Sequence, residues 1–194
     1  MPVHVQAATP DRWDDLVRVF GRRGQDPMWC WCQLFLSSGA EPPPPGGMPD
    51  NRRALRQEVT TATVPPGLIA YVDDRPGGWA RVGPRSAFPR VAANRALATV
   101  LGDSPDAWWV ACLAVDSHHR RSGVGTALLQ AAVSFARDHD ATAVEGHPVD
   151  VGALKASRVS GSALYTGTLA MFVAAGFSEV GRTFPTRPVM RLVT

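Results

Sequence analysis

Residues 108 to 129 constrain the fold of this chain most, because they combine a buried strand, a glycine turn and the start of a helix. Trp108 to Val115 is an unbroken apolar run rich in aromatic and β-branched residues, which is typical of a strand buried on both faces. A short polar turn with two glycines, 120 to 125, follows it. From Val124 onward the apolar residues recur every three or four positions, which is the period of a helix.

The turn between this strand and this helix is predicted to bind a large anion. The first backbone N–H groups of the helix point into the turn, together with the positive end of the helix dipole. Gly123 and Gly125 let the backbone approach a ligand without a Cβ in the way. Arg120 and Arg121 add positive charge and forked hydrogen-bond donors. A phosphate or pyrophosphate suits this combination.

Two common phosphate-binding loops do not fit the turn. A Walker loop has Lys and then Ser or Thr after its last glycine, whereas Thr126 and Ala127 follow Gly125 here. A Rossmann loop has a third glycine three residues after Gly125, where this chain has Leu128.

The stretch instead resembles the acyl-CoA loop of the GCN5-related N-acetyltransferases, the GNAT superfamily, whose pattern is Arg/Gln-x-x-Gly-x-Gly/Ala. The loop reads Arg-Arg-Ser-Gly-Val-Gly at 120–125, and Leu-Ala-Val-Asp at 113–116 resembles the strand end that precedes it in that family. The closing Met-Phe-Val-Ala-Ala-Gly-Phe at 171–177 is similar to the family's last helix and Gly-Phe turn. Trp-Cys-Trp-Cys at 29–32 and Thr-Gly-Thr at 166–168 resemble a bacterial branch of the superfamily.

The order of the expected elements also resembles the GNAT fold. The sequence predicts strands at 3–7, 68–72, 79–82, 108–115, 143–147, 177–182 and 189–193, and helices at 10–20, 50–61, 94–100, 124–137 and 168–175. The two strands at 68–72 and 79–82 read as a hairpin whose loop is 73–78. The resemblance implies an α+β (α/β) fold with a central mixed, mostly antiparallel sheet flanked by helices. Strands 108–115 and 143–147 are expected to be parallel and to splay apart at their carboxyl ends.

Length and composition favour one domain, residues 1–194, in the cytoplasm. A chain of 194 residues can bury a core without disulfides, and three cysteines without a recognisable signal peptide suit a reducing compartment. No apolar run approaches the roughly 18 residues of a membrane span. The formal net charge of +3, without a dense basic cluster, argues against a nucleic-acid partner. Cys30 and Cys32 are too few for a zinc site, so no metal is expected.

Two other segments of the sequence, 28–36 and 38–49, are interpreted from their composition alone. The apolar segment 28–36 is interpreted as a buried segment or the lining of a groove, with its cysteines as small buried hydrophobes. The Pro- and Gly-rich segment 38–49 is predicted to be an exposed loop, which could cover an acceptor site.

The resemblance implies acetyl-CoA as co-substrate and a position for it. Backbone groups of Leu113, Ala114 and Val115 are expected to pair with the pantetheine arm, which brings the thioester to the fork between the two parallel strands. A backbone N–H group there would polarise the thioester carbonyl. The pyrophosphate is expected on the loop and the first helical turn, in contact with Arg120, Arg121, Ser122, Gly123, Val124, Gly125 and Thr126.

The implied reaction is direct attack of a primary amine on acetyl-CoA in a ternary complex. The amine must lose a proton before it attacks, and the leaving thiolate benefits from gaining one. Glu145 is the candidate base, because it is the only carboxylate on the second fork strand. The alternative for Glu145 is a structural pair with an arginine such as Arg81. His147 and His118 are secondary candidates.

The candidate acid is Tyr165. The family usually places a tyrosine four residues before the glycine of the last turn, and this chain has Phe172 there, which cannot donate a proton. The alternative role for Tyr165 is packing in the core or in a loop. The thiolate could also leave without any acid.

Two other functions are compatible with the sequence. Because Phe172 replaces the family's usual tyrosine, the chain is also compatible with a catalytically weak or inactive acyl-CoA-binding module that serves as a sensor or partner subunit. A nucleotide-binding protein that uses the same glycine loop is the third reading. The sequence does not specify the acceptor amine, and a homodimer is compatible with it.

Overall fold

The structure of the protein is a computed structural model, which describes residues 2–20, 30–36, 48–154 and 161–194. Trp29 and residues 38–47 of the segment predicted to be an exposed loop lie outside these ranges.

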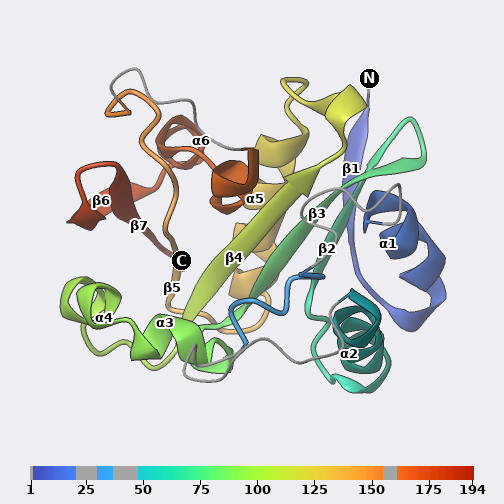
Figure 1. The fold of residues 1–194 in the computed structure, drawn as a ribbon, viewed down its shortest axis with the longest axis horizontal. Helices are drawn as coiled ribbons and strands as arrows, with labels where there is room; N and C mark the ends of the chain where they lie inside the picture. The colour runs from blue at the N-terminus through green and yellow to red at the C-terminus, as the bar shows by residue number, and fades with distance from the viewer. Residues whose placement is uncertain (1, 21–29, 37–47, 155–160) are drawn as a thin grey trace.

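A single seven-stranded sheet forms the centre of the molecule, with the strand order β1-β2-β3-β4-β5-β7-β6 (Figure 1). The strands are β1 (Val3–Ala7), β2 (Gly67–Val72), β3 (Arg75–Pro84), β4 (Ala107–Val115), β5 (Ala143–Gly146), β6 (Ser178–Phe184) and β7 (Arg187–Val193). Neighbouring strands are antiparallel except β4 and β5, which are parallel. The predicted mixed, mostly antiparallel sheet is confirmed.

Helices cover both faces of this sheet. The helices are α1 (Trp13–Phe20), α2 (Met48–Thr61), α3 (Pro89–Ala93), α4 (Arg95–Leu101), α5 (Val124–Arg137) and α6 (Leu169–Ala174), and short 3-10 helices are η1 (Pro10–Arg12), η2 (Arg85–Ala87), η3 (Ser117–His119) and η4 (Gly161–Thr166). In Figure 1, α5 runs behind the sheet, and α1 and α2 lie on the side of β1.

The alternation of side chains along the strands divides the core between the two faces. In β2, Leu68 and Ala70 pack towards α5, whereas Ile69 and Tyr71 pack towards α1 and α2. In β4, Trp109 packs on the same side as Ile69, in a core that α3 and α4 cover. Every residue of β2 is buried, which explains why the strand reads as an unbroken apolar run.

The hairpin between β2 and β3 is tighter than the predicted loop 73–78. Asp73 and Asp74 form a two-residue turn with φ angles of 48° and 60°, and β3 begins at the next residue. Positive φ at both central positions gives the twist that suits a two-residue hairpin. Gly77 does not belong to the turn: it is an extra residue within β3, where the register with β2 shifts.

The sheet forks at the carboxyl end of β4. The parallel pairing of β4 with β5 covers only four positions, from Ala107 with Ala143 to Val110 with Gly146, whereas its pairing with β3 continues to Val115. The register with β3 shifts just beyond Val110, which is a bulge that bends the strand. The last residues of β4 therefore extend beyond β5, and η4 lies against β4. The predicted splayed pair is confirmed, although β5 ends one residue earlier than predicted.

Candidate active site

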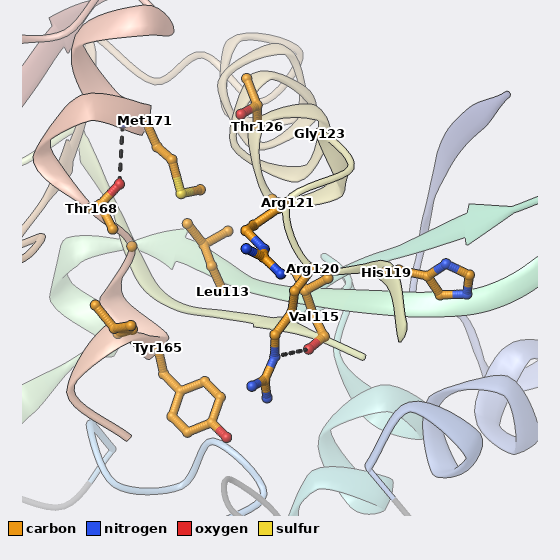
Figure 2. Close-up of a pocket in the computed structure, with 13 residues that line it drawn as sticks. Leu113, Val115, His119, Arg120, Arg121, Gly123, Thr126, Tyr165, Thr168 and Met171 are labelled. Carbon is orange, nitrogen blue, oxygen red and sulfur yellow. Dashed lines mark hydrogen bonds between the residues drawn. The ribbon is translucent and has the colours of Figure 1, made fainter. Parts of the chain in front are cut away.

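A cavity of about 420 Å³ lies beside the carboxyl end of β4 (Figure 2). Its walls come from the end of β4, from the turn that leads into α5, and from the segment of η4 and α6. The residues that line it are Leu113, Val115, His119, Arg120, Arg121, Gly123, Gly125, Thr126, Leu164, Tyr165, Gly167, Thr168 and Met171. The fold thus brings the fork, the glycine turn and Tyr165 to one place.

Three of the residues predicted to bind the cofactor are not among the lining residues. Ala114 packs into the core on the α1 and α2 side, and Val124, the first residue of α5, is buried in the core between α5 and the sheet. The Ser122 hydroxyl donates to the carbonyl oxygen of His119 at 2.5 Å, which holds the turn in shape. Their backbone groups stay close to the cavity because their neighbours on both sides line it.

The glycine turn presents a helix N-terminus to the cavity. Gly123, with φ of 86°, is the N-cap of α5, and its carbonyl oxygen accepts the first helical hydrogen bond from Ala127 at 2.9 Å. The N–H groups of the three residues between them have no acceptor within the helix. A Cβ on Gly125 would lie 2.8 Å from Cε of Met171, so a larger residue would narrow the gap between α5 and α6.

Arg120 and Arg121 add positive charge to this wall. Arg120 Nε donates to the carbonyl oxygen of Val115 at 3.4 Å, and Figure 2 shows the side chains of Arg120 and Tyr165 entering the cavity from opposite walls. Neither arginine forms an ion pair with a carboxylate in the described part of the chain. Two uncompensated cations beside a helix N-terminus fit a diphosphate group.

Tyr165 lies at the boundary between the cavity and the opposite face of the sheet. Its half-buried ring lines the cavity and also packs against the core of α1 and α2. Phe172, at the position where the family usually has a tyrosine, is completely buried. Its ring packs edge-to-face on Phe177 with 4.8 Å between centroids, and it lies so close to Gly146 that a Cβ there would be 2.5 Å from it. Phe172 is therefore a core residue that does not line the cavity.

Glu145 is placed away from the cavity, within a buried ion-pair cluster. It is completely buried and lies opposite Trp109 of β4. Its carboxylate accepts from Arg191 Nε at 2.9 Å and NH2 at 2.6 Å, and from Arg85 NH1 at 3.0 Å. The sequence analysis gave Arg81 as an example of a structural partner for Glu145, but Arg81 pairs instead with Glu58 of α2.

His147 follows β5 directly at the fork, and both of its ring nitrogens have partners. Nδ1 lies 3.3 Å from Arg187 NH2, and Nε2 lies 2.7 Å from the hydroxyl of Thr183. Because a guanidinium group only donates, Nδ1 is the acceptor and the proton is on Nε2. Burial, with the charge of Arg187, lowers the pKa of His147 to about 4, so the ring is neutral at pH 7. His118 is exposed and contacts Asp116 at 2.8 Å.

Several residues of this region were missed by the sequence analysis. His119, Leu164, Gly167, Thr168 and Met171 line the cavity but were not predicted to bind the cofactor. Gly167 and Thr168 belong to the Thr-Gly-Thr motif, and Met171 is the first residue of the 171–177 motif. Arg85, Arg187 and Arg191 carry no local pattern that would reveal their partners. Among the described residues, no group of three or more His, Cys, Asp or Glu is placed to hold a metal ion, and no helix is long and apolar enough to cross a membrane.

The model of the acetyltransferase (GNAT) family matches residues 29–156, which is more than half of the chain. The protein therefore belongs to the GNAT acetyltransferase family, whose members are acyltransferases that transfer an acetyl group from acetyl-CoA. A search of curated proteins finds no match.

Solved structures with the same fold include three acetyltransferases of low sequence identity. Mosquito arylalkylamine N-acetyltransferase like 5b has a TM-score of 0.60 at 13% identity, with 100% of each chain covered. PaiA N-acetyltransferase from Thermoplasma acidophilum, in complex with coenzyme A, has 0.56 at 9% identity, also with 100% of each chain covered. A GNAT acetyltransferase from Desulfovibrio desulfuricans has 0.54 at 19% identity, with 99% of each chain covered. At these identities the structures show the shared fold alone.

Proposed function

We propose that residues 1–194 form one domain that transfers the acetyl group of acetyl-CoA to a primary amine by direct attack in a ternary complex. The observation that carries this proposal is the fork between β4 and β5, which adjoins a cavity whose other wall is a cationic helix N-terminus. Acetyl-CoA would follow one continuous path, with its diphosphate at that wall, its pantetheine arm along β4 and its thioester at the fork.

The backbone of β4 would hold the arm of the co-substrate. Among the described residues, the pairing of β4 with β5 ends at Val110, so backbone groups of Leu113, Ala114 and Val115 can pair with an extended chain as a neighbouring strand would. An N–H group of this segment would donate to the thioester oxygen as negative charge develops on it. The N–H groups at the start of α5, with Arg120 and Arg121, would hold the pyrophosphate.

Tyr165 is the proposed acid. It reaches the cavity from the wall opposite the glycine turn and separates the co-substrate side from the α1 and α2 side. The unprotonated amine forms the new C–N bond while the C–S bond breaks, and the Tyr165 hydroxyl gives its proton to the departing sulfur. The nitrogen then loses its surplus proton to water, and a proton from water restores the Tyr165 hydroxyl. Because the buried Phe172 cannot act here, Tyr165 is the residue whose replacement tests the chemistry.

Replacing Tyr165 with Phe is expected to lower kcat about 100-fold, because the hydroxyl that protonates the sulfur is lost. The KM for acetyl-CoA should change less than about threefold, because the ring that packs against the core remains. The measurement is thiol release from acetyl-CoA over a panel of primary amines. Tyr71→Phe is the matched control, since its hydroxyl bonds Asp15 at 2.9 Å and does not line the cavity. Equal kcat values for Tyr165→Phe and the wild type would remove Tyr165 as the acid.

A thermal-shift series separates this function from its alternatives. Stabilisation by CoA and acetyl-CoA, but not by ATP or NAD, is expected because a ligand that binds the native state raises its stability by mass action. CoA binding without thiol release for any amine would favour the acyl-CoA-binding module. Stabilisation by ATP or NAD alone would favour a nucleotide-binding protein.

A further inference from the structure

Arg187, the first residue of β7, is a half-buried cation that has no counter-ion among the described residues. Its NH1 donates to the Thr166 hydroxyl at 3.1 Å, and its NH2 donates to Nδ1 of His147 at 3.3 Å. Both partners are neutral, since the pKa of His147 lies well below 7. In the part of the chain that the structure describes, no carboxylate lies within ion-pair distance of Arg187, and burial lowers the pKa of its guanidinium group.

Arg187 differs in this respect from every other described arginine that is not exposed. Those other arginines are Arg12, Arg81, Arg85 and Arg191, and each forms an ion pair with an aspartate or a glutamate. A cation taken out of water without an opposite charge is costly, and a ligand with a negative charge would offset that cost.

The position of Arg187 is next to the fork. His147 follows the last residue of β5, and Thr166 stands between Tyr165 and Gly167, both of which line the cavity. Thr166 itself is not a lining residue, and its hydroxyl bonds Arg187. Arg187 therefore lies behind the η4 wall of the cavity.

The face on which Arg187 lies is the one opposite α5. Arg187 and Val189 share a side of β7 by strand alternation, and Val189 packs in the same core as Trp109. An amine that attacks a thioester at the fork would approach from this side, because the other side is occupied by α5 and the glycine turn.

The free donors of Arg187 suit a carboxylate. A guanidinium group has five N–H donors, of which two have partners here, so the remaining three can take a carboxylate in a forked pair. Thr166 and the neutral His147 fix the plane of the group without neutralising it. Such a charge-assisted forked pair is stronger and more directional than a bond to an amide oxygen.

We propose that Arg187 binds a carboxylate group of the acceptor, and that the acceptors are small amines that carry a carboxylate, as amino acids do. This inference rests on the proposed acetyl transfer to a primary amine, and it names the class of acceptor. Arg187 is a specificity residue in this scheme, whereas the bond-making groups are those of the fork and Tyr165.

The test compares each of several amino acids with its own primary amide as acceptor, by thiol release from acetyl-CoA with the full-length protein. Arg187→Gln is expected to lower kcat/KM for the acids about 10- to 100-fold and for the amides less than about threefold. The use of matched pairs in both proteins cancels the different basicity of the two amines. Arg182→Gln is the control: it lies in the same hairpin but already pairs with Glu179 and Asp150, so the ratio of acid to amide should not change.

Equal losses for acids and amides would overturn the inference, because they are what a purely structural arginine would give. If Arg187→Gln does not fold, the wild type must favour the acid over the amide at equal free-amine concentration, and Arg187→Lys must raise the KM for the acids alone. A wild type without that preference would also overturn it. The proposed function fails in a different way, when neither the amino acids, nor their amides, nor carboxylate-free amines such as phenethylamine release thiol.

Discussion

His147 illustrates how single residues beneath the fork depend on their neighbours for their protonation state. Its two nitrogens are held by an arginine that can only donate and by a hydroxyl that accepts. Protonation at Nδ1 would lose the bond to Arg187 and place two positive charges 3.3 Å apart in a half-buried site. The same neutral ring leaves the charge of Arg187 available to a ligand.

This arrangement predicts a pH dependence of stability. The folded-state pKa of His147, about 4, lies below its ordinary value of 6.5, so the unfolded chain binds the proton more tightly. The contribution of His147 to the free energy of unfolding is therefore complete above about pH 6.5 and is lost as the pH falls towards 4, by at most roughly 3 kcal/mol. Urea unfolding between pH 7.5 and pH 4 measures it.

Replacement of His147 by Asn is expected to flatten this part of the stability profile. Replacement of the exposed His118 by Asn is the control and should leave the slope unchanged. An identical slope in wild type and His147→Asn would contradict the assigned neutral state.

At the scale of elements, the junction of β4 with α5 depends on backbone conformation at Gly123. The residue has φ of 86°, and nothing lies within 4 Å of the position that its Cβ would take. A side chain there would therefore meet no protein atom, but its backbone would be strained and it would project from the turn that the diphosphate is proposed to occupy.

Gly123→Ala and Gly123→Glu are expected to lose similar stability, about 1–2 kcal/mol, because the strain belongs to the backbone. Their affinities for CoA should differ, with a loss of more than about 100-fold for Glu and a smaller loss for Ala, since only Glu brings a carboxylate to the phosphates. Gly102→Glu is the control: its φ is 62°, nothing lies within 4 Å of its Cβ position, and it is not among the residues that line the cavity. Unchanged CoA affinity in Gly123→Glu would reject the placement of the diphosphate.

At the scale of the whole molecule, Glu145 joins distant parts of the chain beside the fork. Arg191 links Glu145 to the carbonyl oxygen of Leu101 at 2.7 Å, and Arg85 links it to that of Gly102 at 3.1 Å. The end of α4, the strand β7 and η2 are thereby fastened to β5. A carboxylate enclosed in this way has no contact with the cavity, so we propose that it positions β5 rather than takes a proton from the amine.

Glu145→Gln is expected to lower the free energy of unfolding by about 3–5 kcal/mol, because it leaves two half-buried arginines without their carboxylate. Activity per folded molecule should stay within about threefold of the wild type. Chemical denaturation and thiol release, measured on the same preparation, give both values. A kcat that falls more than about 100-fold with unchanged stability would restore Glu145 as the base predicted from the sequence.

The features that could be predicted from the sequence are those encoded by neighbours along the chain. The run from Trp108 to Val115, the two glycines that follow and the period of α5 identified the strand, the turn and the helix, and they supported the family resemblance. Even locally the prediction had a limit: the hairpin loop was drawn too long because Gly77 was read as part of the turn, whereas pairing with β2 makes it a bulge.

The tertiary structure decided which charges meet. Glu145 lies 60 residues from Arg85 and 46 from Arg191, and Arg187 lies 40 from His147, so no local pattern relates them. Their pairing follows from strand register and from the return of the chain through β7 beside β5. For the same reason the sequence by itself determined a glycine turn between a buried strand and a helix, while only the fold decided that Glu145 pairs with two arginines and that Arg187, beside the fork, pairs with no carboxylate among the described residues. Periodicity is a property of adjacent residues, but the balance of buried charge is a property of the packed molecule.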